Sequence, residues 1–369
     1  MRRWNLIGLV VSAGLFGAVA SCETGSSPGG GDPMKPNEPK PVPYKTTPYA
    51  WQKPANFPDP VYNFARNPLT VEGVELGRML FYDDALPADG TISCGFCHQQ
   101  GSAFAHTDHA LSHGINDKIG TRNNLSLRNL AFYRHFFWDG GVSDLDLLPI
   151  APIENPVEMG HNLGTLLTNL RKSPKCPARF KTAYGTDSIT TERFLKSLSQ
   201  FMLTMVSANS RYDKYVRKEA GGELIPDELT GLTVFKQKCA SCHAGDLFTD
   251  QTFRSNGLSR VAVAPGRRPD EGRSLITLRP EDAYLFKVPS LRNVDRSAPY
   301  MHDGRFTSLE QVLNHYAGGI QDVPELDPAR RTNGKPGIPL TDTEKKRIVA
   351  FLRTLTDFDY ISDRRLGPN

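Results

Sequence analysis

Two five-residue runs, at residues 94–98 (CGFCH) and 239–243 (CASCH), constrain this chain more than any other feature of its sequence. Each has the form C-x-x-C-H, the sequence signature of a covalently attached c-type haem. In such a site both thiols bond to the porphyrin, and the adjacent histidine binds the iron as its proximal ligand. The two runs therefore predict two haems, with these attachment thiols and proximal ligands: Cys94, Cys97, His98, Cys239, Cys242 and His243.

Zinc is the alternative for the four thiols, because two C-x-x-C pairs can supply a tetrahedral zinc site. A zinc site leaves His98 and His243 without a role, and paired zinc knuckles usually lie much closer in sequence than residues 97 and 239. We therefore favour haem. Of the two other cysteines, Cys22 belongs to a targeting segment, and Cys176 is expected to be a free structural thiol in a loop.

Residues 1–22 have the pattern of an export signal. Two arginines precede an apolar run at residues 6–20, which is too short to span a bilayer. The run ends in VASC, which resembles the lipobox of bacterial lipoproteins and implies cleavage before Cys22 and lipidation of its thiol. An ordinary secretory signal is the alternative. Both predict export to the periplasm or cell envelope, and the lipobox adds a lipid anchor in a membrane.

The rest of the chain divides by composition. Residues 23–62 are rich in Gly, Ser and Pro, which predicts a tether. Residues 63–220 and 221–369 are then expected to form an N-terminal and a C-terminal haem domain. Net charge is +4 with both signs well mixed, so no basic stripe indicates nucleic-acid binding.

Helical periodicity dominates these two parts. It predicts helices at residues 74–81, 161–171, 191–206 and 227–238, and a capping box at Thr341–Glu344 predicts one more. Strand signals are scarce. The expected fold class is mainly α, with long loops and little β.

An internal repeat relates the two halves. The sequence SLRN occurs at residues 126–129 and again at 290–293, and an aspartate–glycine pair follows at the same spacing in WDG (138–140) and HDG (302–304). The repeat predicts two cytochrome c-like haem domains related by pseudo-symmetry.

The two copies differ at one informative place. Pro152 lies fourteen residues after Trp138, and Tyr316 lies fourteen after His302. If this position faces the distal side of the iron, the first haem is open to a small molecule, and the phenol of Tyr316 closes the second. The alternative for Tyr316 is a buried aromatic with a hydrogen-bonded hydroxyl.

The ordered motif set from about residue 67 to 357 resembles the bacterial di-haem cytochrome c peroxidase/MauG family. Besides the haem runs, the resemblance is carried by these stretches: GTRN (120–123), FWDG (137–140), PIENPVEMG (152–160), VPSLRN (288–293) and PYMHDG (299–304). It implies reduction of hydrogen peroxide to water at the N-terminal haem. Electrons would come from a small cytochrome c or another periplasmic donor through the C-terminal haem.

The resemblance also implies residue roles. Glu158 would sit over the peroxidatic iron and move a proton as general base and then acid, with a pKa raised by its low-dielectric site. Glu154 is the rival carboxylate, but it matches no catalytic position of the family. Trp138 would lie between the haems. Tyr316 would ligate the second iron, with Met301 as the fallback ligand.

The sequence departs from the family pattern at several positions. Ile115 stands where many members have a ligating histidine, which predicts an open resting site, although His113 is two residues away. His106 and His109 are expected to be loop residues. Tyr316 stands where the peroxidases usually have Met and MauG has Tyr, and phenolate ligation favours ferric iron.

Two further positions bear on the haem pockets, one on each pocket. Leu148 replaces a glutamine that is common in the peroxidatic pocket, and His315 is another fallback ligand of the second iron.

The family also implies one Ca²⁺ between the domains, bound by the Asn123 side chain and the backbone carbonyls of Ser297 and Pro299. Two other functions stay open: a MauG-like oxidation of a protein substrate with peroxide, and a di-haem electron carrier with no chemistry of its own. The sequence is compatible with a monomer and with a homodimer.

Overall fold

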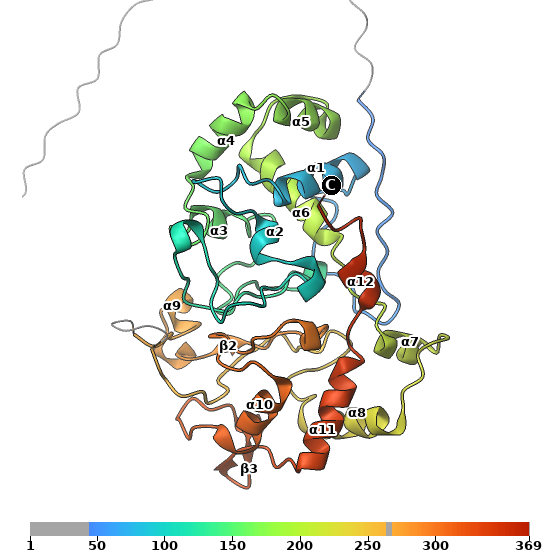
Figure 1. Cartoon of the computed structure of the whole chain (residues 1–369), viewed down its shortest axis with the longest axis vertical. Coiled ribbons are helices and arrows are strands. Elements are labelled where there is room, and N and C mark those ends of the chain that lie inside the picture. The colour runs from blue at the N-terminus through green and yellow to red at the C-terminus, as the bar shows by residue number, and fades with distance from the viewer. Residues whose placement is uncertain (1–43, 263–267, 369) are drawn as a thin grey trace, which may run out of the picture. The chain divides into compact units, whose positions relative to one another are not determined.

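The computed structural model describes residues 44–262 and 268–368 (Figure 1). The predicted signal, Cys22 and the first part of the tether lie outside the described residues. Within them the fold is mainly helical with little strand, as the sequence predicts. The helices are α1 (Val71–Phe81), α2 (Cys94–Cys97), α3 (Ile150–Glu154), α4 (Leu163–Lys172), α5 (Cys176–Tyr184), α6 (Thr191–Leu203), α7 (Arg211–Arg217), α8 (Pro226–Lys238), α9 (Ser274–Thr277), α10 (Leu309–Asn314), α11 (Asp342–Arg353) and α12 (Phe358–Ser362).

Four two-residue strands form two small antiparallel ribbons. β1 (Phe253–Arg254) pairs with β2 (Phe286–Lys287), and β3 (Arg331–Thr332) pairs with β4 (Lys335–Pro336). Both lie in the second half of the sequence, and long irregular segments connect most of the helices (Figure 1).

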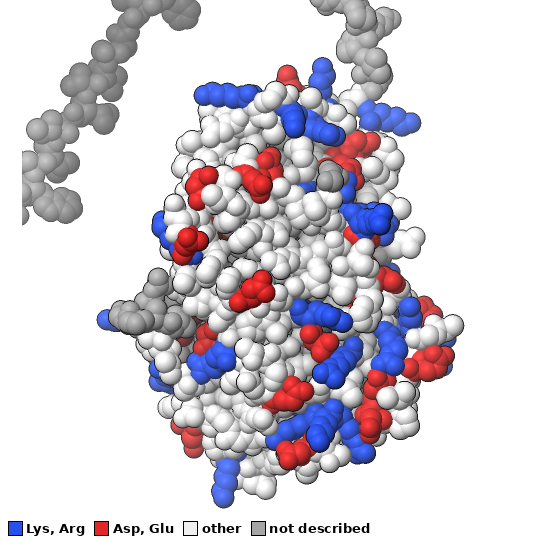
Figure 2. Space-filling view, viewed as in Figure 1, with Lys and Arg blue, Asp and Glu red and all other residues white. Residues whose placement is uncertain are grey.

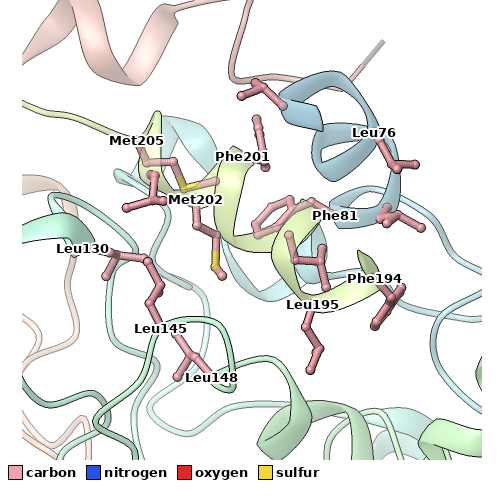
Figure 3. Packing of buried hydrophobic residues seen from close by; sticks show 14 of the residues in the cluster. Leu76, Phe81, Leu130, Leu145, Leu148, Phe194, Leu195, Phe201, Met202 and Met205 are labelled. Carbon is pink, nitrogen blue, oxygen red and sulfur yellow. The ribbon is translucent and has the colours of Figure 1, made fainter. Parts of the chain in front are cut away.

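The first hydrophobic cluster is built around the crossing of α1 and α6. The hydroxyl of Thr190 caps α6 by accepting a bond from the Arg193 N–H, and the apolar face of that helix is buried (Figure 3). Gly77 of α1 lies against α6 so closely that a Cβ would overlap the Ser197 carbonyl. The crossing therefore requires glycine at this position.

The second cluster repeats this arrangement with α8 and α11. α11 begins with the predicted capping box, in which Thr341 and Glu344 bond reciprocally to each other's backbone N–H. Gly231 of α8 lies against α11, and a Cβ there would overlap the carbonyl of Arg347. Each cluster thus has one close helix crossing at a glycine.

Part of the predicted tether is folded. Residues 44–62 pack on the first cluster: the Trp51 indole donates to the Leu203 carbonyl over 3.0 Å, and Phe57 is only 4% exposed. The prediction of a tether over 23–62 is wrong for these residues. The prediction relied on the proline content and overlooked the aromatic side chains of this segment, which pack against the first cluster.

The C-terminal segment also returns to the first cluster. The Tyr360 hydroxyl of α12 donates to the Leu127 carbonyl over 2.5 Å, and the Tyr82 hydroxyl donates to the Leu366 carbonyl over 2.7 Å. Residues 44–369 accordingly make up a single compact unit.

Cys176 is not in a loop. It is the first residue of α5, is 3% exposed and belongs to the first cluster. Pro177 directly after it is favourable at the start of a helix, because the missing N–H would have no partner there. The thiol is free and structural, as expected.

The repeated SLRN turns meet in the interior. Asn129 and Asn293 both have left-handed backbones, with φ of 56° and 53°, and each precedes a short 3₁₀ turn. The Asn129 amide donates to the Ser207 carbonyl over 3.0 Å, and the Asn293 amide donates to the Ser207 hydroxyl over 2.8 Å. Ser207 therefore ties the two turns together.

The surface carries both charge signs. Lysine and arginine side chains alternate with aspartate and glutamate on the face that Figure 2 shows. In the part of the chain that the structure describes, every helix is too short or too polar to traverse a bilayer.

Candidate functional site: two haem cavities

The first haem motif lines a cavity of about 510 Å³, a size typical of cofactor sites. Cys94, Cys97 and His98 all lie on its wall. The Nδ1 of His98 is 2.9 Å from the Phe104 carbonyl, which can only accept a hydrogen bond. Nδ1 must therefore carry the proton, which leaves the Nε2 lone pair for an iron. Burial lowers the pKa of His98 to about 4, so the imidazole is neutral.

The second motif has the same local geometry. Cys239 and His243 line a separate cavity of about 170 Å³, and the Nδ1 of His243 is 3.1 Å from the Phe248 carbonyl. Burial lowers the pKa of His243 to about 4 as well. Both sets of residues fit a covalently attached haem with a proximal histidine.

The zinc alternative does not fit. Within residues 44–262 and 268–368, no three His, Cys, Asp or Glu side chains come together in a way that could hold a metal ion. Cys94 and Cys97 line the first cavity and Cys239 lines the second, so the two C-x-x-C pairs do not form one tetrahedral site.

Glu158 lies on the wall of the first cavity, in the loop that follows α3. Its Oε1 accepts a hydrogen bond from the Asn155 amide over 2.9 Å. Burial raises its pKa, and the bond from Asn155 only partly opposes this effect. Glu154 is exposed at the end of α3 and accepts a weak bond from the Leu163 N–H, 3.4 Å away. Glu158 alone of these two carboxylates is placed to act in the cavity.

Sequence reasoning did not single out Asn155 as a functional residue. Its amide orients the carboxylate of Glu158. The signal was available, since Asn155 stands three residues before Glu158 within the 152–160 stretch.

The loop at residues 112–120 contains Ile115, which stands where many family members have a ligating histidine, and His113. The Ile115 N–H donates to the Glu158 carbonyl over 2.8 Å, and its side chain packs toward Gly160. Ser112, His113 and Gly120 of this loop line the first cavity, whereas Ile115 does not, and His113 is the histidine among them. The His113 ring stacks on His109 at 4.1 Å between ring centres, parallel to within 6°.

His106 is a loop residue, as predicted, but it is buried. It is 4% exposed, and its ring packs against Phe96 and His109. The three histidines after the first haem motif therefore form a row of contacting rings.

Trp138 lines both cavities. Its indole N–H donates to the Asn123 carbonyl over 2.9 Å, and its own carbonyl accepts from the Lys287 N–H over 2.7 Å. The first bond orients the indole and the second holds its backbone; the place between the haems stays a prediction.

Tyr316 lines the second cavity, and Pro152 lines the first. Tyr316 lies in a π-helical turn, His315–Gly319, which continues α10; such turns occur frequently at functional sites. Among the described residues, no partner accepts from or donates to its hydroxyl.

The fallback ligands have other contacts. Met301 lines the second cavity, where its sulfur accepts from the Asn256 amide over 3.3 Å. The Nε2 of His315 is 2.9 Å from the Asn256 carbonyl, so this nitrogen is already engaged. Tyr316 is the better candidate ligand.

The residues assigned to calcium come together but bond directly. The Asn123 amide nitrogen donates to the Pro299 carbonyl over 3.2 Å and to the Ala110 carbonyl over 3.0 Å. Asn123, Ser297 and Pro299 line the second cavity together. In this arrangement the side-chain nitrogen of Asn123, and not the side-chain oxygen, faces the Pro299 carbonyl that would bind calcium.

Three polar side chains in the first cavity were also missed by sequence reasoning. Arg128, Tyr133 and Lys287 lie on its wall, and so does Leu148, which is buried there. Only the presence of Arg128 in the repeated SLRN stretch hinted at a role.

Two haem-attachment motifs, each with a proximal histidine in its own cavity, define a di-haem c-type protein. Comparison with known proteins specifies the class further. A family model described as di-haem cytochrome c peroxidase matches residues 71–221. The methylamine utilization protein MauG of Methylorubrum extorquens is 32% identical over 314 residues, which cover 83% of each chain. The cytochrome c551 peroxidase of Nitrosomonas europaea is 32% identical over 294 residues, which cover 79% of this chain and 82% of the relative.

A solved structure gives the same result. The crystal structure of a MauG-like protein associated with microbial copper homeostasis aligns with a TM-score of 0.76 and 30% identity, over 86% of this chain and 99% of the other. The diheme peroxidase BthA from Burkholderia thailandensis, at 24% identity and a TM-score of 0.68, shares the fold. The chain belongs to the di-haem cytochrome c peroxidase/MauG family, and membership implies two c-type haems.

Proposed function

We propose that this protein reduces hydrogen peroxide to water at the haem held by His98, with electrons that a small redox protein delivers through the haem held by His243. The observation that carries the proposal is the difference between the two cavities. A carboxylate, Glu158, lines the first, and a phenol, Tyr316, lines the second. Trp138 lines both.

When bound, the first haem supplies the iron at which peroxide is reduced by two electrons and two protons to two waters. The chain's own contribution is proton transfer. Glu158 accepts the proton from one peroxide oxygen and returns it to the other, which leaves as water. Its raised pKa suits both halves of this transfer, because the group must first take up and then release a proton. Asn155 holds the carboxylate in position.

Trp138 is proposed to carry electrons between the haems, since it lines both cavities and its indole N–H is held by the Asn123 carbonyl. Tyr316 is proposed to ligate the second iron. Its half-buried phenol on the cavity wall, with no bonded partner among the described residues, favours this role over a purely structural aromatic.

Two haem domains related by pseudo-symmetry, at residues 63–220 and 221–369, are part of the proposal. It is supported by matching features in the two halves: the histidine–carbonyl contacts, the glycine helix crossings, and the left-handed asparagines. The C-terminal segment that contains α12 would belong to the second domain by sequence but pack on the first domain.

We also propose export to the periplasm with a lipid anchor at Cys22, on the sequence pattern of residues 1–22. A Cys22→Ser variant should lose radiolabelled fatty acid and leave the membrane fraction. Retention of the label on the variant would contradict this assignment.

A calcium ion at Asn123, Ser297 and Pro299 is a further proposal. It would require the Asn123 amide to rotate so that its oxygen replaces its nitrogen. Metal analysis of the purified protein checks it: one calcium per chain that is lost in Asn123→Ala supports the site, and no calcium contradicts it.

Steady-state assays test the peroxidase function. Peroxide consumption that saturates with a reduced cytochrome c is expected, with a large loss in Glu158→Gln. A pure electron carrier would show only background consumption in both proteins.

A MauG-like oxidation of a protein substrate is the second candidate, because Tyr316 stands where MauG has Tyr. It predicts slow turnover with cytochrome c and peroxide-dependent oxidation of side chains in a partner protein.

A further inference from the structure

Three polar side chains on the wall of the first cavity have hydrogen-bond donors without acceptors. The Nε of Arg128 and the hydroxyl of Tyr133 are buried and have no partner among the described residues. The Lys287 ammonium lies 5.0 Å from the centre of the Tyr133 ring, and within the described part of the chain no carboxylate or carbonyl accepts from it. Arg128 and Tyr133 are only 6% and 9% exposed.

The matching arginine of the second repeat shows the contrast. Arg292 donates from Nε to the Asp246 carbonyl over 2.7 Å, and its two terminal nitrogens reach the Asp213 carboxylate over 2.8 and 2.6 Å. Arg128 makes one bond, from Nη2 to the Ser290 carbonyl over 2.8 Å. The two arginines occupy equivalent places in the SLRN repeat, but only Arg292 has a counter-charge.

Two cations close together in a low-dielectric wall are unfavourable unless an anion joins them. Burial, together with the charge of the nearby Arg128, lowers the pKa of Lys287 to about 8. Burial likewise lowers the pKa of Arg128. Two acidic side chains lie on the cavity wall: Asp139, which pairs with Arg122, and Glu158, which accepts a hydrogen bond from Asn155. In the described part of the chain neither carboxylate pairs with Arg128 or Lys287.

We propose that Arg128, Tyr133 and Lys287 form a carboxylate-binding site for a propionate of the haem in the first cavity. The inference rests on the haem assignment. A c-type haem is attached through its vinyl groups, so its two propionates stay free as carboxylates. The three side chains offer hydrogen-bond donors, and two of them are cations, which is the chemistry that binds a carboxylate. Arg128 and Lys287 also line the second cavity, whereas Tyr133 lines the first alone, and Tyr133 thus assigns the site to the first haem.

The site has an electrostatic consequence. A positive charge beside the propionate disfavours the ferric state, whose iron carries one more positive charge than the ferrous state. Lys287 and Arg128 therefore raise the reduction potential of the first haem.

The test compares Lys287→Met, which keeps the length of the side chain, with Lys287→Arg, which keeps the charge. Lys236→Met is the matched control, because Lys236 is exposed on α8 and its replacement changes the net charge by the same amount. Midpoint potentials of both haems are measured spectroelectrochemically, and propionate bending bands by resonance Raman spectroscopy. A pyridine haemochrome assay first confirms two haems per chain, so that failure of the haem assignment is distinguished from failure of this proposal.

In Lys287→Met the potential of the first haem should fall by about 59 mV, which is a tenfold change in a one-electron equilibrium. The propionate bands of that haem should shift, and Lys287→Arg and Lys236→Met should resemble the parent protein. Tyr133→Phe, which removes one hydroxyl, should shift the same bands even if Lys287→Met does not fold. Unchanged bands in Tyr133→Phe, or an unchanged first potential in a folded Lys287→Met protein with two haems, would overturn the proposal.

Discussion

The residues that distinguish the two cavities are few, and each acts through a specific contact. The Nδ1 of His98 faces the Phe104 carbonyl and that of His243 faces the Phe248 carbonyl, and burial lowers the pKa of each histidine to about 4. Glu158 lines the first cavity and Tyr316 lines the second, and we propose that both lie on the distal sides of their haems. In this proposal, single side chains decide the functional difference between the two haems.

Replacing Glu158 by Gln keeps the size of the side chain but removes the base. Peroxide consumption should fall by about 10²- to 10⁴-fold, the range typical of a positioned proton-transfer group. Glu154→Gln is the control, because Glu154 is exposed four residues earlier. Equal activity of the two variants in the steady-state assay would show that Glu158 does not move the proton.

The pH dependence of the peroxide reaction follows from the same carboxylate. Burial raises the pKa of Glu158 above its ordinary value of 4.5. The base form is lost as pH falls through this raised pKa, so activity should decline on the acid side at a higher pH than for an exposed glutamate. The pre-steady-state rate, measured as a function of pH, should show this limb in the parent protein. A limb of the same midpoint in Glu158→Gln would assign it to another group.

At the scale of helices and turns, the sequence predicted the helices whose positions depend on local capping and periodicity. Capping residues and apolar periodicity predicted α1, α4, α6, α8 and α11, and the structure confirms them. The folding of residues 44–62 and the helical place of Cys176 were missed, because long-range packing of scattered aromatics decides them. The cluster of Arg128, Tyr133 and Lys287 was missed for the same reason, since its members come from two distant segments.

The close helix crossings make two glycines indispensable. In Gly77→Ala and in Gly231→Ala the new methyl group meets a backbone carbonyl, which cannot rotate away. Each variant should lose about 1–3 kcal/mol of unfolding free energy, the usual cost of overpacking. Gly101→Ala is the control, since nothing lies within 4 Å of the position of its Cβ. Urea unfolding that is indistinguishable among the three variants would contradict the crossing geometry.

The buried pair of Arg292 and Asp213 anchors α7 to the second SLRN turn. Both side chains are completely buried, and they approach to 2.6 Å. Although burial alone would raise it, the pKa of Asp213 is lowered by the bonds from Arg292. Its contribution is therefore present above the ordinary aspartate pKa and is lost as pH falls through the lower folded value.

Asp213→Asn should destabilise the protein by about 3–5 kcal/mol, because it leaves the Arg292 cation uncompensated. Asp187→Asn, at an exposed position, should be nearly neutral. Urea midpoints at neutral pH measure both. A difference of less than about 1 kcal/mol between the variants would show that the pair does not hold α7 in place.

At the scale of the whole molecule, two hydrophobic clusters each support one haem cavity, and Trp138 lines both. The two c-type haems could be predicted because their attachment residues lie in short motifs, and His98, Glu158 and His243, which the sequence singled out, do line the cavities. The position of His113 on the cavity wall could not be predicted, since it depends on how the 112–120 loop is tied to Glu158.

Trp138→Phe tests the connection between the two cavities. It removes the indole N–H and the more easily oxidised ring, and retains an aromatic side chain. Electron transfer from the second haem to the first should slow by at least tenfold in stopped-flow experiments (on the order of 1.4 kcal/mol in barrier). Peroxide binding to the first haem should be unaffected. An unchanged transfer rate would show that electrons take a path without Trp138.

The central claim is that the first iron is open and the second is closed by Tyr316. A low-temperature EPR spectrum of the resting ferric protein measures this directly. We predict one high-spin and one low-spin haem in equal amounts, and loss of the low-spin signal in Tyr316→Phe. Two low-spin haems in the parent protein, with His113 or another side chain on the first iron, would contradict the account.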